Sequence, residues 1–339
     1  MENNQPIAIG VIGAGYWGPN LIRNFSLLSD CRVKYACDVN EARLAPLARQ
    51  YPGIITTTQV QDLFSDSALD AVLIATPVFT HFSLAQQALA AGKHVLLEKP
   101  MAATVRECEE LRALAAQRNR VLMIDHTFLY TGAVRKIRSL VRAGELGELY
   151  YFDSERINLG LIQPDVNVLW DLAPHDISIM NHIFEGLRPV SVFATGTRHV
   201  SRNACEMAHL TMQFDRGIVG HIHVSWLSPV KIRKMLIGGS KKMIVYDDIH
   251  PSEKVKVYDR GVTVDFLQET SMTPVYRSGD AFIPQLESEE ALLREARHFI
   301  RCVRGEEEPF VDASAGLAVV RILEAADSSM RSGRVIELS

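Results

Sequence analysis

The stretch from Ile7 to Gly18 constrains the fold of this 339-residue chain more than any other segment. It begins with residues 7–12 (IAIGVI), a mostly apolar run that predicts a buried strand. Residues 13–18 (GAGYWG) then match the pattern G-x-G-x-x-G, whose glycines permit a tight turn, close approach of a phosphate and packing of helix on strand. Pro19 suits the first turn of the helix that follows. A strand, glycine turn and helix in this order predict a site for the pyrophosphate of a dinucleotide.

The residue that ends the second strand indicates which dinucleotide is bound. We expect that strand over 33–37, and Asp38 follows it, 25 residues after Gly13. A carboxylate there accepts hydrogen bonds from the ribose hydroxyls of the adenosine and repels the additional phosphate of NADP. Residues 39–42 are Val, Asn, Glu and Ala, so no basic residue follows immediately. The sequence therefore favours NAD, the alternative being that Asp38 is only a turn residue.

Length and composition exclude several classes of protein. The length suits two domains. The net charge is -4 with both signs interspersed, which provides no basic patch for nucleic acid or an anionic membrane. Apolar runs are of strand length, shorter than the roughly 20 residues of a membrane span, and the first residues are polar. The five cysteines contain no C-x-x-C pair, so we expect a cytoplasmic protein with reduced thiols.

Strand and helix patterns alternate up to residue 125, which predicts a doubly wound parallel sheet. We therefore expect an N-terminal Rossmann domain over 1–125 that binds NAD. Helix caps are expected at Thr80 and Thr104. The other strands and helices expected in this part are 41–50, 70–75, 81–91, 94–97, 105–117 and 121–124.

The pattern changes in the second part, 126–339, where we expect an α+β domain that binds substrate and forms the oligomer. A helix over 133–143 precedes a strand over 148–158, and several consecutive strands between 191 and 258 predict a large, open, mostly antiparallel sheet. A helix over 176–185 is expected to cover one face, and the other, expected to be rich in Val, Ile and Phe, to contact another subunit. Two C-terminal helices, 289–303 and 313–330, are expected to pack across both domains.

Lys99 is the first candidate for catalysis. Glu98, Lys99 and Pro100 follow the expected strand 94–97, so they lie at the carboxyl edge of the sheet, where open α/β folds bind ligands. An ammonium group there stabilises the negative charge that develops on a reacting oxygen. The alternative is a solvated surface lysine.

Asp171 and His175 form the second candidate pair. Their four-residue spacing places them on one face of a helix, and Pro174 requires this to be the first turn. A carboxylate beside an imidazole raises its basicity, which suits a proton acceptor for the oxidation of an alcohol. The alternative is a structural ion pair at a helix start.

These features in combination resemble the glucose-fructose oxidoreductase / inositol dehydrogenase (Gfo/Idh/MocA) family over nearly the full chain. The resemblance implies a Rossmann domain, an α+β domain with a large open sheet, and dimers or tetramers built through that sheet. It also implies hydride transfer between NAD(P) and a sugar-like alcohol, with Lys99, Asp171 and His175 at the catalytic positions. The residues that carry it are Gly13 to Gly18, Asp38, Thr76, Pro77, His81, Glu98, Lys99, Pro100, Asp171 and His175.

Two departures and two segments refine the resemblance. The family often has a glycine-rich segment where 165–170 reads DVNVLW, and an asparagine where Val78 stands. Segments 15–20 and 165–176 look like the branch found with polysaccharide and nucleotide-sugar genes. Members of that branch oxidise the 3-hydroxyl of a UDP-N-acetylglucosaminuronate ahead of transamination, which implies a UDP-linked amino sugar or sugar uronate as substrate.

The remaining candidates follow from position. Residues expected to contact the cofactor are Gly13, Gly15, Tyr16, Trp17, Gly18, Asp38, Asn40, Thr76, Pro77, His81, Glu98 and Lys99. Residues expected to contact the substrate are Lys99, His126, Asn158, Asn167, Asp171 and His175. We expect no metal, because His221 and His223 share a strand face but two ligands are too few. The basic residues Lys231, Arg233 and Lys234 either bind a phosphorylated substrate or form an exposed strand face, and the three tryptophans are expected to pack.

Other activities fit the same residues. One is a dehydrogenase of a free sugar or inositol, and another is a glycosidase on this fold in which NAD oxidises the sugar transiently and is recycled. A metal-dependent alcohol oxidation is a third. An NAD-sensing protein without enzymatic activity is the fourth, although it has no need of a proton acceptor at His175.

Overall fold

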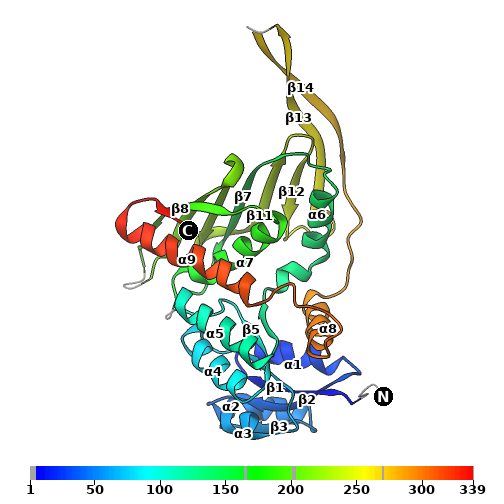
Figure 1. The fold of residues 1–339 in the computed structure, drawn as a ribbon, viewed down its shortest axis with the longest axis vertical. Helices are drawn as coiled ribbons and strands as arrows, with labels where there is room; N and C mark the ends of the chain where they lie inside the picture. Colours follow the sequence, from blue (N-terminus) through cyan, green and yellow to red (C-terminus); the bar gives the residue numbers. More distant parts are fainter. Residues whose placement is uncertain (1–4, 164–165, 201–203, 269–270, 339) are drawn as a thin grey trace. The chain divides into compact units, whose positions relative to one another are not determined.

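The computed structural model describes residues 5–163, 166–200, 204–268 and 271–338. The chain divides into two compact units, each described by itself below (Figure 1). Unit 1 consists of the residues up to Tyr130 together with Glu289–Arg321, and unit 2 of Thr131–Ser288 together with Ile322–Ser339. The first unit thus ends a few residues after the expected boundary at 125, and it also contains a segment from the C-terminal part of the chain.

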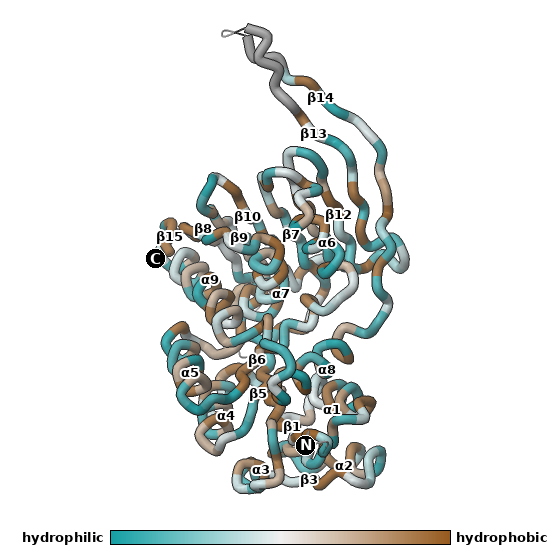
Figure 2. Tube along the Cα trace, turned by 45° about the vertical axis from the view of Figure 1, so that its right-hand side comes forward, coloured by the Kyte–Doolittle hydropathy of each residue, from teal (hydrophilic) through white to brown (hydrophobic). Residues whose placement is uncertain are grey.

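Unit 1 contains a parallel sheet with the strand order β3-β2-β1-β4-β5-β6. Each pair of neighbours is parallel, which confirms the predicted doubly wound fold. Strands covered by helices on both faces are apolar throughout, and Figure 2 shows β5 and β6 as hydrophobic segments. The strands are β1 (Ile7–Ile12), β2 (Cys31–Cys37), β3 (Ile55–Thr57), β4 (Ala71–Ile74), β5 (His94–Glu98) and β6 (Leu122–Asp125).

Four helices of unit 1, α1, α2, α4 and α5, begin where the chain provides a cap or a proline. Thr104 and Glu107 form the capping box of α5, as predicted for Thr104. Helix α4 begins at Val78, so the prediction that Thr80 caps it was wrong; the Thr80 hydroxyl donates to the carbonyl of Pro77, 2.7 Å away. The helices are α1 (Gly18–Ser26), α2 (Glu41–Gln50), α3 (Val60–Ser65), α4 (Val78–Ala90), α5 (Val105–Arg118), η1 (Thr127–Tyr130), α8 (Ala291–Val303) and the first part of α9 (Ala313–Ser332).

Unit 2 is built on a mixed sheet with the strand order β14-β13-β12-β11-β7-β10-β9-β8-β15. Among the described strands, β7 and β10 pair in parallel and the other neighbours pair antiparallel, which confirms the predicted mostly antiparallel sheet. The hairpin of β13 and β14 was not predicted, and it extends beyond the other strands (Figure 1). The strands are β7 (Leu149–Leu159), β8 (Pro189–Thr197), β9 (Met207–Phe214), β10 (Val219–Ser225), β11 (Leu227–Gly239), β12 (Met243–Asp247), β13 (Val255–Gln268), β14 (Ser271–Phe282) and β15 (Ile336–Glu337).

Helices α6 (Gly132–Arg142) and α7 (Val168–Ile183) belong to unit 2, and α7 packs on the face of the sheet that carries Gly220. Helix α7 begins at Val168, earlier than the sequence indicates, with Asn167 as its cap. The expectation that Pro174 lies in the first turn was therefore wrong. Pro174 is buried in the second turn, where burial of this apolar stretch outweighs the lost backbone hydrogen bond.

The opposite face of this sheet is more polar than the sequence predicts. His209, His223, Glu155 and Lys234 lie opposite one another on neighbouring strands of this face. The rings of His209 and His223 stack with centroids 4.2 Å apart. Apolar side chains such as Leu236 lie among these polar ones. The prediction that this face is rich in Val, Ile and Phe was therefore wrong. Among the described residues, no helix is long and apolar enough to cross a membrane.

Candidate functional site

The glycine turn of unit 1 leaves an open space above its backbone. Gly13 has a φ of +98°, and a side chain there would clash with the carbonyl of Ala75. A side chain at Gly18 would clash with the carbonyl of Gly13, so the start of α1 packs directly on the turn. Apart from Gly15 and its two chain neighbours, no described residue has a heavy atom within 4 Å of the position that a Cβ of Gly15 would occupy. This turn fits the pyrophosphate of NAD, because N–H groups at the start of α1 face a space without side chains.

Asp38 connects the end of β2 to the glycine turn. Its carboxylate accepts hydrogen bonds from the backbone N–H of Ala14, at 2.7 Å, and of Asn40, at 2.8 Å. Arg43 Nη1 lies 3.6 Å from Asp38 Oδ2. Arg43 comes directly after residues 39–42, the segment in which the sequence has no basic residue. Asn40 itself caps α2 through its side chain. Contact of Asp38 and Asn40 with the ribose of NAD stays a prediction.

The two aromatic residues of the turn differ in exposure. Tyr16 is exposed, and its ring stacks on that of Trp17 with centroids 6.1 Å apart. The indole N–H of Trp17 donates to Asp125 Oδ2 at 3.1 Å. Trp17 therefore joins the glycine turn to the end of β6, a polar contact that the expectation of simple packing did not include.

His81 holds together the loops that follow β4 and β5. It is buried, with Nε2 2.8 Å from the carbonyl oxygen of Thr76 and Nδ1 2.8 Å from that of Pro100. Burial lowers the pKa of His81, and a neutral imidazole donates to only one of the two carbonyls at a time. Thr76 also contacts Thr80 through its hydroxyl, at 2.7 Å. His81, Thr76 and Pro77 thus lie at the carboxyl edge of the sheet, and their contact with the cofactor stays a prediction.

Lys99 lies among titratable groups at the same edge. Its backbone N–H donates to Glu98 Oε2 at 3.2 Å, and burial raises the pKa of Glu98 well above its usual range, a shift that the charge of Lys99 opposes. The same charge adds to the burial that lowers the pKa values of His126 and His81. His126 is buried, and burial lowers its pKa to about 4, so it is neutral near pH 7. Unit 1 therefore brings Lys99, Glu98 and His126 together. Asp125, which accepts the hydrogen bond of Trp17, lies at the end of the neighbouring strand β6.

In unit 2, Trp226 holds Asp171. The indole N–H of Trp226 donates to Asp171 Oδ2 at 3.1 Å, and Trp226 is buried. Asp171 and His175 lie one helical turn apart in α7, as predicted. Sequence reasoning missed the role of Trp226 because the two partners are 55 residues apart, and no local pattern links them.

Asn158 and Trp226 both lie close to the backbone of Gly160. A side chain at Gly160 would come within 2.8 Å of the Trp226 ring and 3.3 Å of Asn158 Nδ2, so the chain passes closely over both. Asn167 accepts from the backbone N–H of Trp170 and donates to Asp327 Oδ1 at 3.1 Å, which makes it the cap of α7. Contact of Asn158 and Asn167 with substrate stays a prediction.

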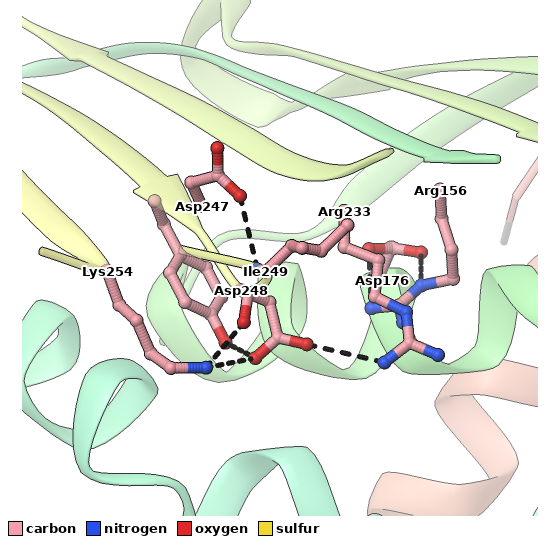
Figure 3. Close-up of polar contacts among 8 residues, drawn as sticks. Arg156, Asp176, Arg233, Asp247, Asp248, Ile249 and Lys254 are labelled. Atoms are coloured by element: carbon pink, nitrogen blue, oxygen red, sulfur yellow. Dashed lines mark hydrogen bonds and ion pairs between the residues drawn. The ribbon is translucent and has the colours of Figure 1, made fainter. Parts of the chain in front are cut away.

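A charged network lies beneath α7 on the covered face of the sheet (Figure 3). Asp176 forms a two-point ion pair with Arg156, with Nε–Oδ2 2.7 Å, and both side chains are buried. Asp248 accepts from Arg233 at 3.4 Å and from Lys254 at 3.2 Å, and these cations lower the pKa of Asp248. The Asp176–Arg156 pair holds α7, which carries His175, against the strands.

Of the other basic and histidine candidates, Lys234 and His223 lie close to acidic side chains. Lys234 lies 3.5 Å from Asp247, while Lys231 is exposed. His223 Nδ1 lies 3.3 Å from Glu155 Oε1. In the part of the chain that the structure describes, no group of three or more side chains has the arrangement of a metal site.

Two family models match the chain in succession. The model described as an oxidoreductase family with an NAD-binding Rossmann fold matches residues 7–126. The model of the GFO/IDH/MocA C-terminal domain matches residues 134–245. Together these matches cover about two thirds of the chain.

Full-length relatives have the same organisation. A UDP-N-acetylglucosamine 3-dehydrogenase of Acidithiobacillus ferrooxidans is 29% identical, with 92% of this chain and 93% of the relative covered. A scyllo-inositol 2-dehydrogenase (NADP(+)) of Bacillus subtilis is 22% identical, with 98% and 96% covered. The solved structure of GenD2 from gentamicin A biosynthesis, in complex with NAD, superimposes with a TM-score of 0.85 at 21% identity, covering 99% of this chain and 97% of that chain. With the NAD-binding fold in unit 1 and the family's C-terminal domain in unit 2, the chain belongs to the GFO/IDH/MocA family of NAD-dependent sugar and polyol oxidoreductases.

Proposed function

We propose that this oxidoreductase oxidises a hydroxyl group of a UDP-linked amino sugar or sugar uronate, at C3, with NAD as acceptor. The observation that carries the proposal is the Asp171–Trp226 contact, which holds a carboxylate one turn from His175 in the unit matched by the family's C-terminal domain. The substrate class is supported by the relative whose name specifies UDP-N-acetylglucosamine. We propose in addition that the reaction belongs to polysaccharide biosynthesis. In this proposal unit 1 binds NAD, and unit 2 binds substrate and forms dimers or tetramers through its sheet.

Each candidate residue then has a distinct role. NAD, when bound, supplies the acceptor for the hydride. His175 accepts the proton of the substrate hydroxyl, and Asp171 stabilises the charged imidazole that results. Trp226 holds Asp171 in position by donating one hydrogen bond to Oδ2. Lys99 stabilises the negative charge that develops on the substrate oxygen.

A polyol without a nucleotide is the second candidate substrate. The relative named as a scyllo-inositol dehydrogenase covers almost the whole chain and favours this reading. The two candidates differ in the phosphates of the UDP group, which require cationic or N–H partners, whereas an inositol requires none. A substrate screen therefore separates them.

The test is NADH formation by the full-length chain with UDP-N-acetylglucosamine, its uronate, the free sugars and the inositols. We expect turnover with a UDP-linked sugar and loss of at least about 100-fold in Lys99→Ala and His175→Ala, as for removal of a proton acceptor or an electrostatic stabiliser. Lys241→Ala, at an exposed lysine, is the matched control. Turnover of inositol alone, or normal rates in His175→Ala, would contradict the proposal.

A further inference from the structure

Three acidic side chains lie together inside unit 1, and of the three only Glu98 is an expected contact of the cofactor. Glu98 at the end of β5 and Asp125 at the end of β6 are direct neighbours in the parallel sheet. Glu295 comes from α8, which packs on η1, the turn that follows β6. Glu295 is 0% exposed, and its charge interacts with those of both Asp125 and Glu98. We call these three residues the carboxyl cluster.

The hydrogen bonds in the carboxyl cluster are unequally distributed. Asp125 accepts from the Trp17 indole and from both the N–H and the hydroxyl of Thr127. In contrast, no described N–H or O–H group donates to either oxygen of Glu295 or to Oε1 of Glu98, although these atoms are buried. The polar groups near Glu295 are Asp125 and the Thr127 hydroxyl, which gives its one proton to Asp125. Glu295 can therefore hydrogen-bond to them only if its own carboxyl group carries a proton.

Electrostatics agree with this geometry. Burial, followed by the charge of Asp125, raises the pKa values of Glu98 and Glu295 well above the usual range. Glu98 and Glu295 both interact with Asp125, so the protonation of one affects the other. The protonation state of these two buried carboxyl groups then depends on any charge that is added nearby.

The groups that face the cluster include one fixed cation at the cofactor edge. Lys99 acts on Glu98, and neutral His126 lies beside Lys99. On the other side, burial raises the pKa of Tyr130, whose hydroxyl is 2.8 Å from His298 Nδ1. His298 lies 3.8 Å from Glu307, which is partly exposed. The cluster thus lies between the carboxyl edge of the sheet and a line of titratable groups that leads to the surface of unit 1.

We propose that Glu98, Asp125 and Glu295 form a proton-sharing cluster that binds a proton when NADH replaces NAD+ in unit 1. The physical reason is that NAD+ carries a positive charge on its ring and NADH does not. The strand ends and the glycine turn, which Asp125 contacts through Trp17, are where such folds bind the dinucleotide. Loss of a nearby positive charge favours the protonated form of a carboxyl group.

This uptake accompanies the proposed reaction, on which the inference rests. When the alcohol is oxidised, its C–H electron pair reduces NAD+, its O–H bond breaks, and the products are a carbonyl compound, NADH and one proton, which His175 accepts and passes to solvent. The cluster separately takes up a proton from solvent when the positive charge of NAD+ is lost, and returns it to solvent when NADH leaves. Glu295 is thereby a positioning residue, because it acts through Asp125 and Glu98 and touches neither cofactor nor substrate.

The test counts protons without any sugar. The full-length chain is titrated with NAD+ and separately with NADH in weak buffer with a pH indicator near neutral pH, and binding is followed by protein fluorescence. We expect the complex with NADH to hold more protons, by on the order of half to one proton per cofactor. Glu295→Gln and Glu98→Gln should reduce this difference at least twofold. Glu109→Gln, an exposed glutamate paired with Arg321 in the same unit, is the matched control and should leave it unchanged.

An equal proton count for the two cofactor forms, or an unchanged difference in Glu295→Gln, would overturn the inference. If Glu295→Gln does not fold, infrared spectra of the wild-type chain decide, since a protonated buried carboxyl group has its own carbonyl stretch. That band should change between the NAD+ and NADH complexes, and its absence also overturns the inference. A failed sugar screen with an intact proton difference would refute the proposed substrate alone.

Discussion

The buried ion pair between Arg156 and Asp176 should be the most sensitive charged contact of unit 2. The guanidinium binds the carboxylate at two points (Figure 3). Ser154 adds a hydrogen bond at 2.8 Å. The side chains are 4% and 1% exposed, so neither charge is solvated. Removing one partner leaves the other charge buried and uncompensated.

Asp176→Ala should lower the free energy of unfolding of unit 2 by about 3–5 kcal/mol, the usual cost of breaking a buried pair. The double variant Arg156→Met, Asp176→Leu should recover most of that loss, because a buried pair replaced by apolar side chains of similar volume is often neutral. Glu185→Ala breaks a pair that is about half exposed on its acidic side and should cost no more than about 1 kcal/mol.

Urea unfolding followed by tryptophan fluorescence measures these values for one unit. In a Trp17→Phe background the remaining tryptophans, Trp170 and Trp226, both belong to unit 2, so the signal reports on that unit. A cost below about 1 kcal/mol for Asp176→Ala, or a double variant less stable than the single one, would refute the reasoning.

Three further predictions follow from the candidate site and its surroundings. Gly13→Ala should reduce NAD affinity at least about tenfold in a fluorescence titration, because its φ is +98° and the new methyl group meets the Ala75 carbonyl; unchanged affinity would contradict the assignment of the turn. Trp226→Phe should keep the fold but lower kcat by about 10-fold and shift its pH profile, since Asp171 loses its donor; a change in melting temperature alone would indicate a purely structural role. Burial lowers the pKa values of His94, His126 and His182 to about 4. In the unfolded chain these histidines have the ordinary pKa of about 6.5, so below that pH the unfolded chain binds more protons than the folded one. The free energy of unfolding is therefore highest above about pH 6.5, and it falls between about pH 6.5 and 4 by on the order of 1–3 kcal/mol for each residue. Urea midpoints in His182→Gln should depend less on pH in that window, and an unaltered slope would argue against a buried neutral imidazole.

Local signals in the chain were enough to predict the nucleotide-binding half. The glycines at 13, 15 and 18, the acid at 38 and the cap at Thr104 act over a few residues, and the structure places each at the expected end of a strand or helix. The second sheet was also predicted, because alternation of side chains is visible along each strand. By contrast, β3 and α3 are too short to produce a periodic signal, and of the β13–β14 hairpin only the start of β13 was predicted, within the strands expected up to residue 258.

Only the tertiary structure determines the contacts between residues that are far apart in the chain. Nothing around Trp226 indicates that its indole holds Asp171, and nothing around Glu295 distinguishes it from the other glutamates near α8. Pro174 was expected to mark a helix start because intrinsic propensity favours that position, yet the helix extends through it where burial against the sheet stabilises it. A sequence pattern records the preferences of a residue and its neighbours along the chain, whereas desolvation and hydrogen bonding across a core depend on which distant segments meet.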